Sequence, residues 1–117
     1  MAAPVLDPLV IESLRQLTPP GEPDVLKEVL ELFLNDVPGR LARLRAACEA
    51  GNAVELQRVA HSLKGSSGNI GANAMLAVCR LLDELGRSGD VSSGSGLVES
   101  LDAEFARVKA EIHRLTA

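Results

Sequence analysis

Apolar residues recur along the chain at alternating steps of three and four positions, and breaker residues divide this pattern into five segments. Such steps place side chains on one face of a helix, so each segment is predicted to be an amphipathic helix. The predicted helices cover about residues 8–17, 24–50 and 53–70, a fourth helix follows Asn73 and ends near Arg87, and a last helix follows Gly96 and ends near Leu115. No alternation typical of a strand persists, so the predicted fold class is all-α.

The predicted helix ends carry residues that favour them. Asp7 followed by Pro8 is typical of an N-cap and a first helical residue. Gly51 and Asn52 indicate a glycine stop followed at once by a new N-cap, and Gly71-Ala72-Asn73 repeats this stop and start. Because these links are so short, successive helices are expected to run antiparallel.

Two interruptions of the pattern have different predicted consequences. Pro38 removes the amide that would donate to the carbonyl of Leu34, so we expect a kink there. The apolar stripe keeps its phase across Pro38, which favours one bent helix over two. The segment Ser88–Gly96 is rich in serine and glycine and is predicted to be a flexible loop.

Four long amphipathic helices with short links predict an antiparallel up-down-up-down four-helix bundle, and the short N-terminal helix is additional to it. With 117 residues the chain is predicted to form a single domain, 1–117, because a second core would compete with the first for apolar residues. The first helix has surplus apolar residues at Leu9, Val10 and Ile11. They either form part of a docking surface or cap the open end of the bundle.

Composition and charge narrow the possible functions. The chain is 46% hydrophobic, which is too high for a disordered protein, yet no apolar run approaches the roughly 20 residues that cross a bilayer. The net charge of −4 gives no attraction for nucleic acid or anionic lipid, so no nucleic acid and no membrane is expected as a partner. The N-terminus lacks the features of a secretory signal, which predicts a cytoplasmic protein. Cys48 and Cys79 lie on apolar stripes and are predicted to be buried free thiols.

The third predicted helix carries the candidate chemistry. On a helical wheel with about 100° per residue, His61 falls at about 140° from Leu56, which marks the core stripe. The imidazole is therefore predicted to point outward. Its neighbours within one turn on the exposed side are Gln57, Arg58, Lys64 and Gly65.

Gly65 and Gly68 are unusual inside a helix, where each costs about 1 kcal/mol relative to alanine. Gly65 falls on the solvent face, so we interpret it as clearing the approach of a partner to His61. Gly68 either does the same or allows a neighbouring helix to come close. Lys64 is placed to reach an anion bound to the ring. His113 in the last helix has no such surroundings and is interpreted as an ordinary surface residue.

The outward face of this helix belongs to a longer run, Ala60-His61-Ser62-Leu63-Lys64-Gly65-Ser66-Ser67-Gly68-Asn69-Ile70-Gly71-Ala72. This run resembles the signature of histidine-containing phosphotransfer (HPt) domains of bacterial multistep phosphorelays. The resemblance extends to Phe33-Leu34 in the second helix, to the Gly-Asn turn before the motif, and to Leu101 and Phe105 in the last helix. It covers nearly the whole chain.

The resemblance implies a role for each matching residue. His61 matches the phosphorylated histidine, Lys64 the cation that stabilises the phosphoryl group, and Gly65 the small residue that lets a partner dock. The implied partners are receiver domains of response regulators and hybrid histidine kinases, each with a phosphorylatable aspartate and its own Mg²⁺. No cofactor and no metal site is therefore expected on this chain.

The same resemblance and the helical wheel together predict where a partner docks. The predicted docking residues are Gln57, Arg58, Gly65 and Gly68. Positions on the fourth helix vary within the family, so further docking candidates there are Arg80, Asp83, Glu84 and Arg87.

The implied function is that of a phosphorelay intermediate, which accepts a phosphoryl group on His61 from a receiver aspartate and passes it to another. Neutral imidazole can act as the nucleophile, and we expect Nε2 to attack because it is the more exposed nitrogen on a helix surface. The chain has no nucleotide-binding motif of the Walker or kinase type, so a phosphohistidine carrier is expected rather than an enzyme. It is predicted to be a monomer.

Three other functions are possible for a bundle with this sequence. The chain could be the phosphoacceptor domain of a chemotaxis-type kinase, fed directly by that kinase, or an interaction module in which His61 is incidental. A metal-binding bundle is disfavoured, because two distant histidines and two core cysteines supply no pair of ligands at helical spacing.

Overall fold

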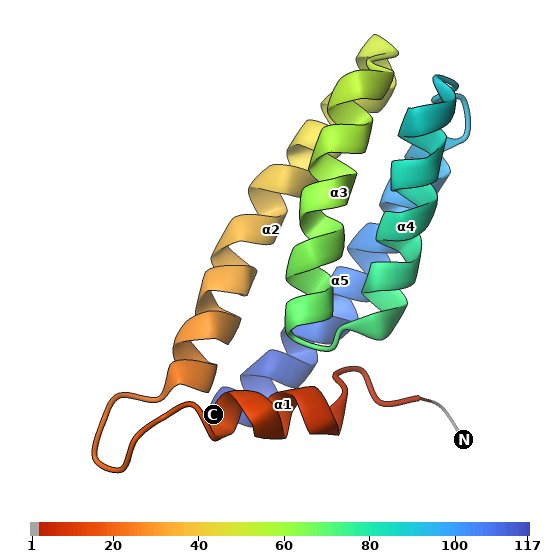
Figure 1. The fold of residues 1–117 in the computed structure, drawn as a ribbon. Coiled ribbons are helices and arrows are strands. Elements are labelled where there is room, and N and C mark those ends of the chain that lie inside the picture. The colour runs from red at the N-terminus through yellow and green to blue at the C-terminus, as the bar shows by residue number, and fades with distance from the viewer. Residues whose placement is uncertain (1–2) are drawn as a thin grey trace.

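The computed structural model describes residues 3–117, which form five helices. They are α1 (Pro8–Arg15), α2 (Val25–Ala50), α3 (Ala53–Asn69), α4 (Asn73–Ser88) and α5 (Gly94–Thr116). Helices α2 to α5 run side by side, and α1 lies across one end of them (Figure 1). Because α2 and α4 each pack against both α3 and α5, the four long helices form a closed bundle. The prediction of an all-α four-helix bundle with an extra N-terminal helix is confirmed.

The apolar stripes predicted from the sequence meet in the middle of this bundle. Phe33 of α2 and Phe105 of α5 pack with ring centroids 6.1 Å apart and their planes tilted by 59°. Helix α3 buries Leu56, Val59, Ala60, Leu63 and Ser67. The whole predicted core face of α3 is therefore buried, and its opposite face is left for other contacts.

Two of the three predicted helix starts have the expected chemistry. The Asp7 carboxylate accepts a hydrogen bond from the Leu9 amide at 2.9 Å, and the Asn52 side-chain oxygen accepts one from the Glu55 amide at 3.1 Å. Asn73 does not cap α4, because it is already the first helical residue and Ala72 precedes it without a side-chain hydrogen bond. The turn at Gly71 is so tight that a single residue separates it from the next helix.

The predicted loop Ser88–Gly96 is too long, because Gly94, Ser95 and Gly96 belong to α5 and Ser88 belongs to α4. Gly94 is buried, and a Cβ on it would lie 2.7 Å from Sγ of Cys48. The absence of a side chain at Gly94 therefore allows close packing against Cys48, and it does not mark a flexible linker. Cys48 is half-buried and only Cys79 is fully buried, although both thiols are free.

Two expectations within the first two helices have different outcomes. Helix α2 continues as one helix through Pro38, as predicted, and the kink there stays a prediction. Helix α1 ends at Arg15, two residues earlier than expected. Ile11 is buried in the common core, which supports a capping role, whereas the Leu9 side chain is 79% exposed.

Helix α1 covers the end of the bundle at which α3 has its C-terminus. The Asp7 amide donates to the Gly71 carbonyl at 2.9 Å, which attaches the start of α1 to the link between α3 and α4. Within residues 3–117, no helix combines the length and the apolar character needed to span a membrane.

Candidate functional site

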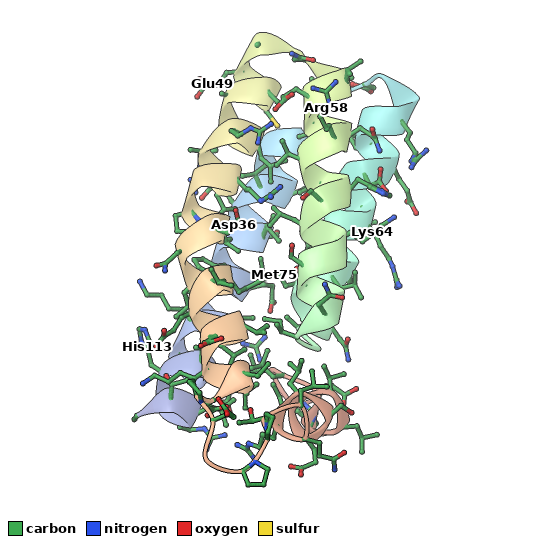
Figure 2. All side chains as sticks on the ribbon, turned by 60° about the vertical axis from the view of Figure 1, so that its left-hand side comes forward. Asp36, Glu49, Arg58, Lys64, Met75 and His113 are labelled. Carbon is green, nitrogen blue, oxygen red and sulfur yellow. The ribbon has the colours of Figure 1, made fainter. Side chains whose placement is uncertain are left out.

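His61 lies on the face of α3 that points away from the core. Its side chain is 57% exposed, while Ala60 and Leu63 on either side of it are buried. Arg58 and Lys64 lie along the same helix, on either side of His61 in sequence (Figure 2). The helical phase that buries the apolar stripe of α3 therefore also presents the imidazole to solvent, as predicted.

A buried carboxylate lies behind the imidazole. Asp83 comes from the neighbouring helix α4, and only 5% of its side chain is exposed. Its Oδ2 is 3.5 Å from Nδ1 of His61 and 2.9 Å from Nζ of Lys64. Helices α3 and α4 thus build one site from an imidazole, an ammonium and a carboxylate.

The second oxygen of Asp83 also has two partners. Oδ1 accepts a hydrogen bond from Nε2 of Gln57 at 2.9 Å and from Nε of Arg87 at 3.1 Å. Burial raises the pKa of the Asp83 carboxyl, but hydrogen bonds from Gln57, Lys64 and His61, together with the charge of Arg87, lower it well below its ordinary range. Asp83 is therefore ionised throughout the physiological range.

The ionised carboxylate of Asp83 determines which nitrogen of the His61 ring is protonated in the neutral form. A carboxylate only accepts hydrogen bonds, so Nδ1 of His61 must be the donor in this long contact. In the neutral imidazole the lone pair is then left on Nε2.

Close contact between α3 and α4 makes this arrangement possible. A Cβ on Gly86 would lie 2.6 Å from Cβ of Gln57 and 2.7 Å from its amide nitrogen. Only glycine fits there without a shift of one helix, so Gly86 lets α4 come close enough for Asp83 to reach the ring. By contrast, a Cβ on Gly68 would lie 3.9 Å from Leu76, an ordinary contact. Close helix packing therefore does not require glycine at position 68.

Gly65 is the glycine one turn after His61 on the exposed face. A Cβ there would meet nothing within 4 Å, so the space beside the imidazole is open. Nothing inside the domain requires glycine at this position. Its role in the docking of a partner stays a prediction.

The other residues singled out from the sequence have varied positions. Arg58 is 69% exposed and lies 3.6 Å from Glu55, whereas Gln57 turns toward Asp83. Lys64 also turns toward Asp83 and is not a free cation. On α4, Arg80 and Glu84 are exposed, and Arg87 binds Asp83. His113 lies near the C-terminal end of α5, well away from Lys64 (Figure 2).

Asp83 is the site residue that sequence reasoning placed wrongly, as a candidate on the docking surface. It is buried, and it contacts His61 instead. The signal that could have identified it is its spacing: it follows buried Cys79 by four residues and buried Met75 by eight, so it lies on the core face of α4. A carboxylate on that face must have partners, and the motif helix supplies them.

Between residues 3 and 117, no three His, Cys, Asp or Glu side chains gather in a way that could hold a metal ion.

Comparisons with known proteins agree on one family. The Hpt domain family matches residues 28–114 of this chain. The crystal structure of histidine-containing phosphotransfer protein B (HptB) from Pseudomonas aeruginosa PAO1 is similar with a TM-score of 0.88 and 35% sequence identity, over 97% of this chain and 95% of that chain.

Two curated plant proteins are also similar. Histidine-containing phosphotransfer protein 5 of Arabidopsis thaliana is 31% identical over 87% of this chain and 67% of its own length. Histidine-containing phosphotransfer protein 2 of the same plant is 26% identical over 85% of this chain and 65% of its own length. The match thus spans about two thirds of each plant protein.

Proposed function

This chain belongs to the Hpt domain family, and from that premise we propose that His61 is the residue that carries the phosphoryl group. Members of the family are phosphotransfer proteins and not kinases, and they relay phosphoryl groups with receiver domains. The observation that carries the assignment is an exposed imidazole whose Nδ1 faces an ionised carboxylate, which leaves Nε2 free to react. His113 has no comparable environment.

The proposed reaction is a direct transfer from a receiver aspartate. The lone pair of Nε2 attacks the phosphorus of the aspartyl phosphate, the N–P bond forms, and the bond from phosphorus to the aspartate oxygen breaks. The proton on Nδ1 stays on the ring during this step. The phosphoryl group then passes to a second receiver aspartate by the reverse chemistry.

Lys64 is proposed to stabilise the charge on the phosphoryl group. Its ammonium is one turn from His61 and is 31% exposed, so it can turn from Asp83 to a phosphoryl oxygen. The receiver is proposed to bring the Mg²⁺, and no residue of this chain is proposed to bind it. This chain contributes the nucleophile, the lysine and the carboxylate behind the ring.

The proposed docking surface for the receiver surrounds His61 on α3. Gly65 leaves open space beside the ring, and Arg58 offers an exposed guanidinium one turn before it. Gln57 and Gly68 border the same face, although Gln57 also has a structural contact with Asp83. The location in the cytoplasm and the monomeric state stay predictions.

The test mixes the purified protein with a receiver that has been phosphorylated from labelled acetyl phosphate in the presence of Mg²⁺. We expect label that is labile in acid and stable in alkali, as phosphohistidine is. His61→Gln should remove the label and keep the helicity, whereas His113→Gln should keep both. Equal labelling of His61→Gln would overturn the assignment, and label obtained only from ATP and a kinase would favour direct phosphorylation by a kinase.

A further inference from the structure

One oxygen of Asp83 is shared by two donors at the centre of the site. Oδ2 faces both Nζ of Lys64, at 2.9 Å, and Nδ1 of His61, at 3.5 Å. The lysine has the shorter contact, and the ring has the longer one. Oδ1 already accepts hydrogen bonds from Gln57 and Arg87. A movement of Lys64 therefore changes how strongly Oδ2 can accept a hydrogen bond from Nδ1 of His61.

A phosphoryl group on Nε2 would compete for this lysine. It carries up to two negative charges and three acceptor oxygens, whereas the Asp83 carboxylate carries one charge that it divides among four donors. Lys64 is partly exposed and its stem is flexible, so the ammonium can leave Oδ2. Oδ2 would then be free to accept a full hydrogen bond from Nδ1.

We propose, resting on the function proposed above, that phosphorylation of His61 draws Lys64 away from Asp83 and that Asp83 then holds the proton on Nδ1 of the phosphorylated ring. Asp83 is thus a positioning residue for onward transfer. When the N–P bond breaks with Nδ1 protonated, the bonding electrons return to Nε2 and the ring leaves as neutral imidazole. Without that proton it would have to leave as an imidazolate anion, which is a far poorer leaving group.

The other charged groups near the ring are either paired with another residue or exposed to solvent. On α3, Arg58 pairs with Glu55, and Glu55 also binds Arg43 of α2. On α2, Arg40 pairs with Asp36 and donates to Ser62. On α4, Arg87 binds Asp83 through the oxygen that does not face the ring, and Arg80 and Glu84 are exposed. Asp83 is the carboxylate that faces Nδ1.

The experiment follows the Nδ1 proton directly. Protein labelled with ¹⁵N at histidine, in a His113→Gln background, is phosphorylated with phosphoramidate, and the ¹⁵N and ³¹P spectra of the phosphorylated ring are recorded against pH. We expect Nδ1 to lose its proton at least one pH unit higher in the wild-type site than in Asp83→Asn, a difference of roughly tenfold in proton affinity. Transfer from phosphorylated Asp83→Asn to a receiver should be slower by up to the same factor, which is reached at a pH above both titrations.

Arg87→Gln is the matched control. It removes another partner of the same carboxylate but leaves Oδ2 facing the ring, so the Nδ1 titration should stay close to that of the wild type. If Asp83→Asn does not fold, the wild-type phosphoprotein is compared with free phosphohistidine.

The outcomes separate this inference from the function on which it rests. An Nδ1 titration that is the same with and without the carboxylate, or the same as in free phosphohistidine, would overturn the role of Asp83 and leave the phosphoacceptor assignment intact. Failure of His61 to accept a phosphoryl group from either phosphoramidate or a receiver would overturn the proposed function itself.

Discussion

The backbone of Gly86 approaches Gln57 so closely that a Cβ on residue 86 would lie 2.8 Å from Cα of Gln57. This contact lies three residues after Asp83 on α4 and four residues before His61 on α3, which is one turn away on each helix. Gly86 therefore fixes the separation of the two helices at the level where the carboxylate meets the imidazole.

Gly86→Ala is expected to destabilise the bundle by about 1–3 kcal/mol, because the added methyl group would overlap the Gln57 backbone and force the helices apart. Urea denaturation followed by circular dichroism measures this difference in the free energy of unfolding. Gly96→Ala is the control, since a Cβ there meets nothing within 4 Å. If Gly86→Ala were as stable as the wild type, the close approach would not constrain the helices.

Gly65→Gln should weaken receiver binding by tenfold or more, about 1.4 kcal/mol, because the longer side chain fills the open space beside His61. Glutamine forms helices better than glycine does, so the thermal stability should stay the same or rise. Titration with a receiver measures the affinity. Gly96→Gln makes the same replacement on α5, which packs mainly against α2 and α4, and should bind as the wild type does. Equal affinities for both variants would show that docking does not use the space at Gly65.

Lys64→Ala is predicted to slow phosphoryl transfer by roughly tenfold, which corresponds to about 1.4 kcal/mol in the activation free energy. It also removes one donor from Asp83, so we expect a loss of about 1–2 kcal/mol in stability while the bundle stays folded. Rapid-quench labelling gives the rate, and thermal denaturation gives the stability. An unchanged rate in a folded variant would show that the lysine serves Asp83 alone.

The pH dependence of stability should report the charge on Asp83. Its pKa is lower in the folded protein than in the unfolded chain, so its contribution is present above the ordinary carboxyl pKa of about 4 and is lost as the pH falls below that value. Asp83→Asn should therefore be less stable at neutral pH, by about 1–3 kcal/mol, and should lose less stability than the wild type between pH 5 and pH 2. Denaturation at several pH values tests this. Parallel curves for the two proteins would contradict it.

The helices and the outward position of His61 could be predicted because both depend on local sequence. Spacing along α3 buries Leu56 and Leu63 and so places His61 on the opposite face, whatever the helix packs against. The turn at Gly51 is equally local, since its φ of 65° suits glycine. Neither inference needed a contact with a distant part of the chain.

The features that were missed depend on contacts between distant segments. Gly94 resembles a linker residue in sequence but begins α5, and its missing side chain accommodates Cys48, 46 residues earlier. Asp83 lies on the core face of α4, but the sequence does not show that four donors, three of them on α3, surround its carboxylate. Such partners can be identified only from the three-dimensional arrangement of the helices.

The attachment of Asp7 to Gly71 bears on how this protein can be cut and recombined. The match to the Hpt domain family model begins at residue 28, yet Leu6, Ile11 and Leu26 belong to the same core as Ile70 and Met75. A fragment trimmed to residues 28–114 would lose the helix that closes this end of the bundle and would expose apolar side chains at the end of the histidine helix (Figure 1). Chimaeras that exchange signalling specificity between relatives should therefore place their N-terminal junction before Leu6, so that α1 travels with the bundle it closes.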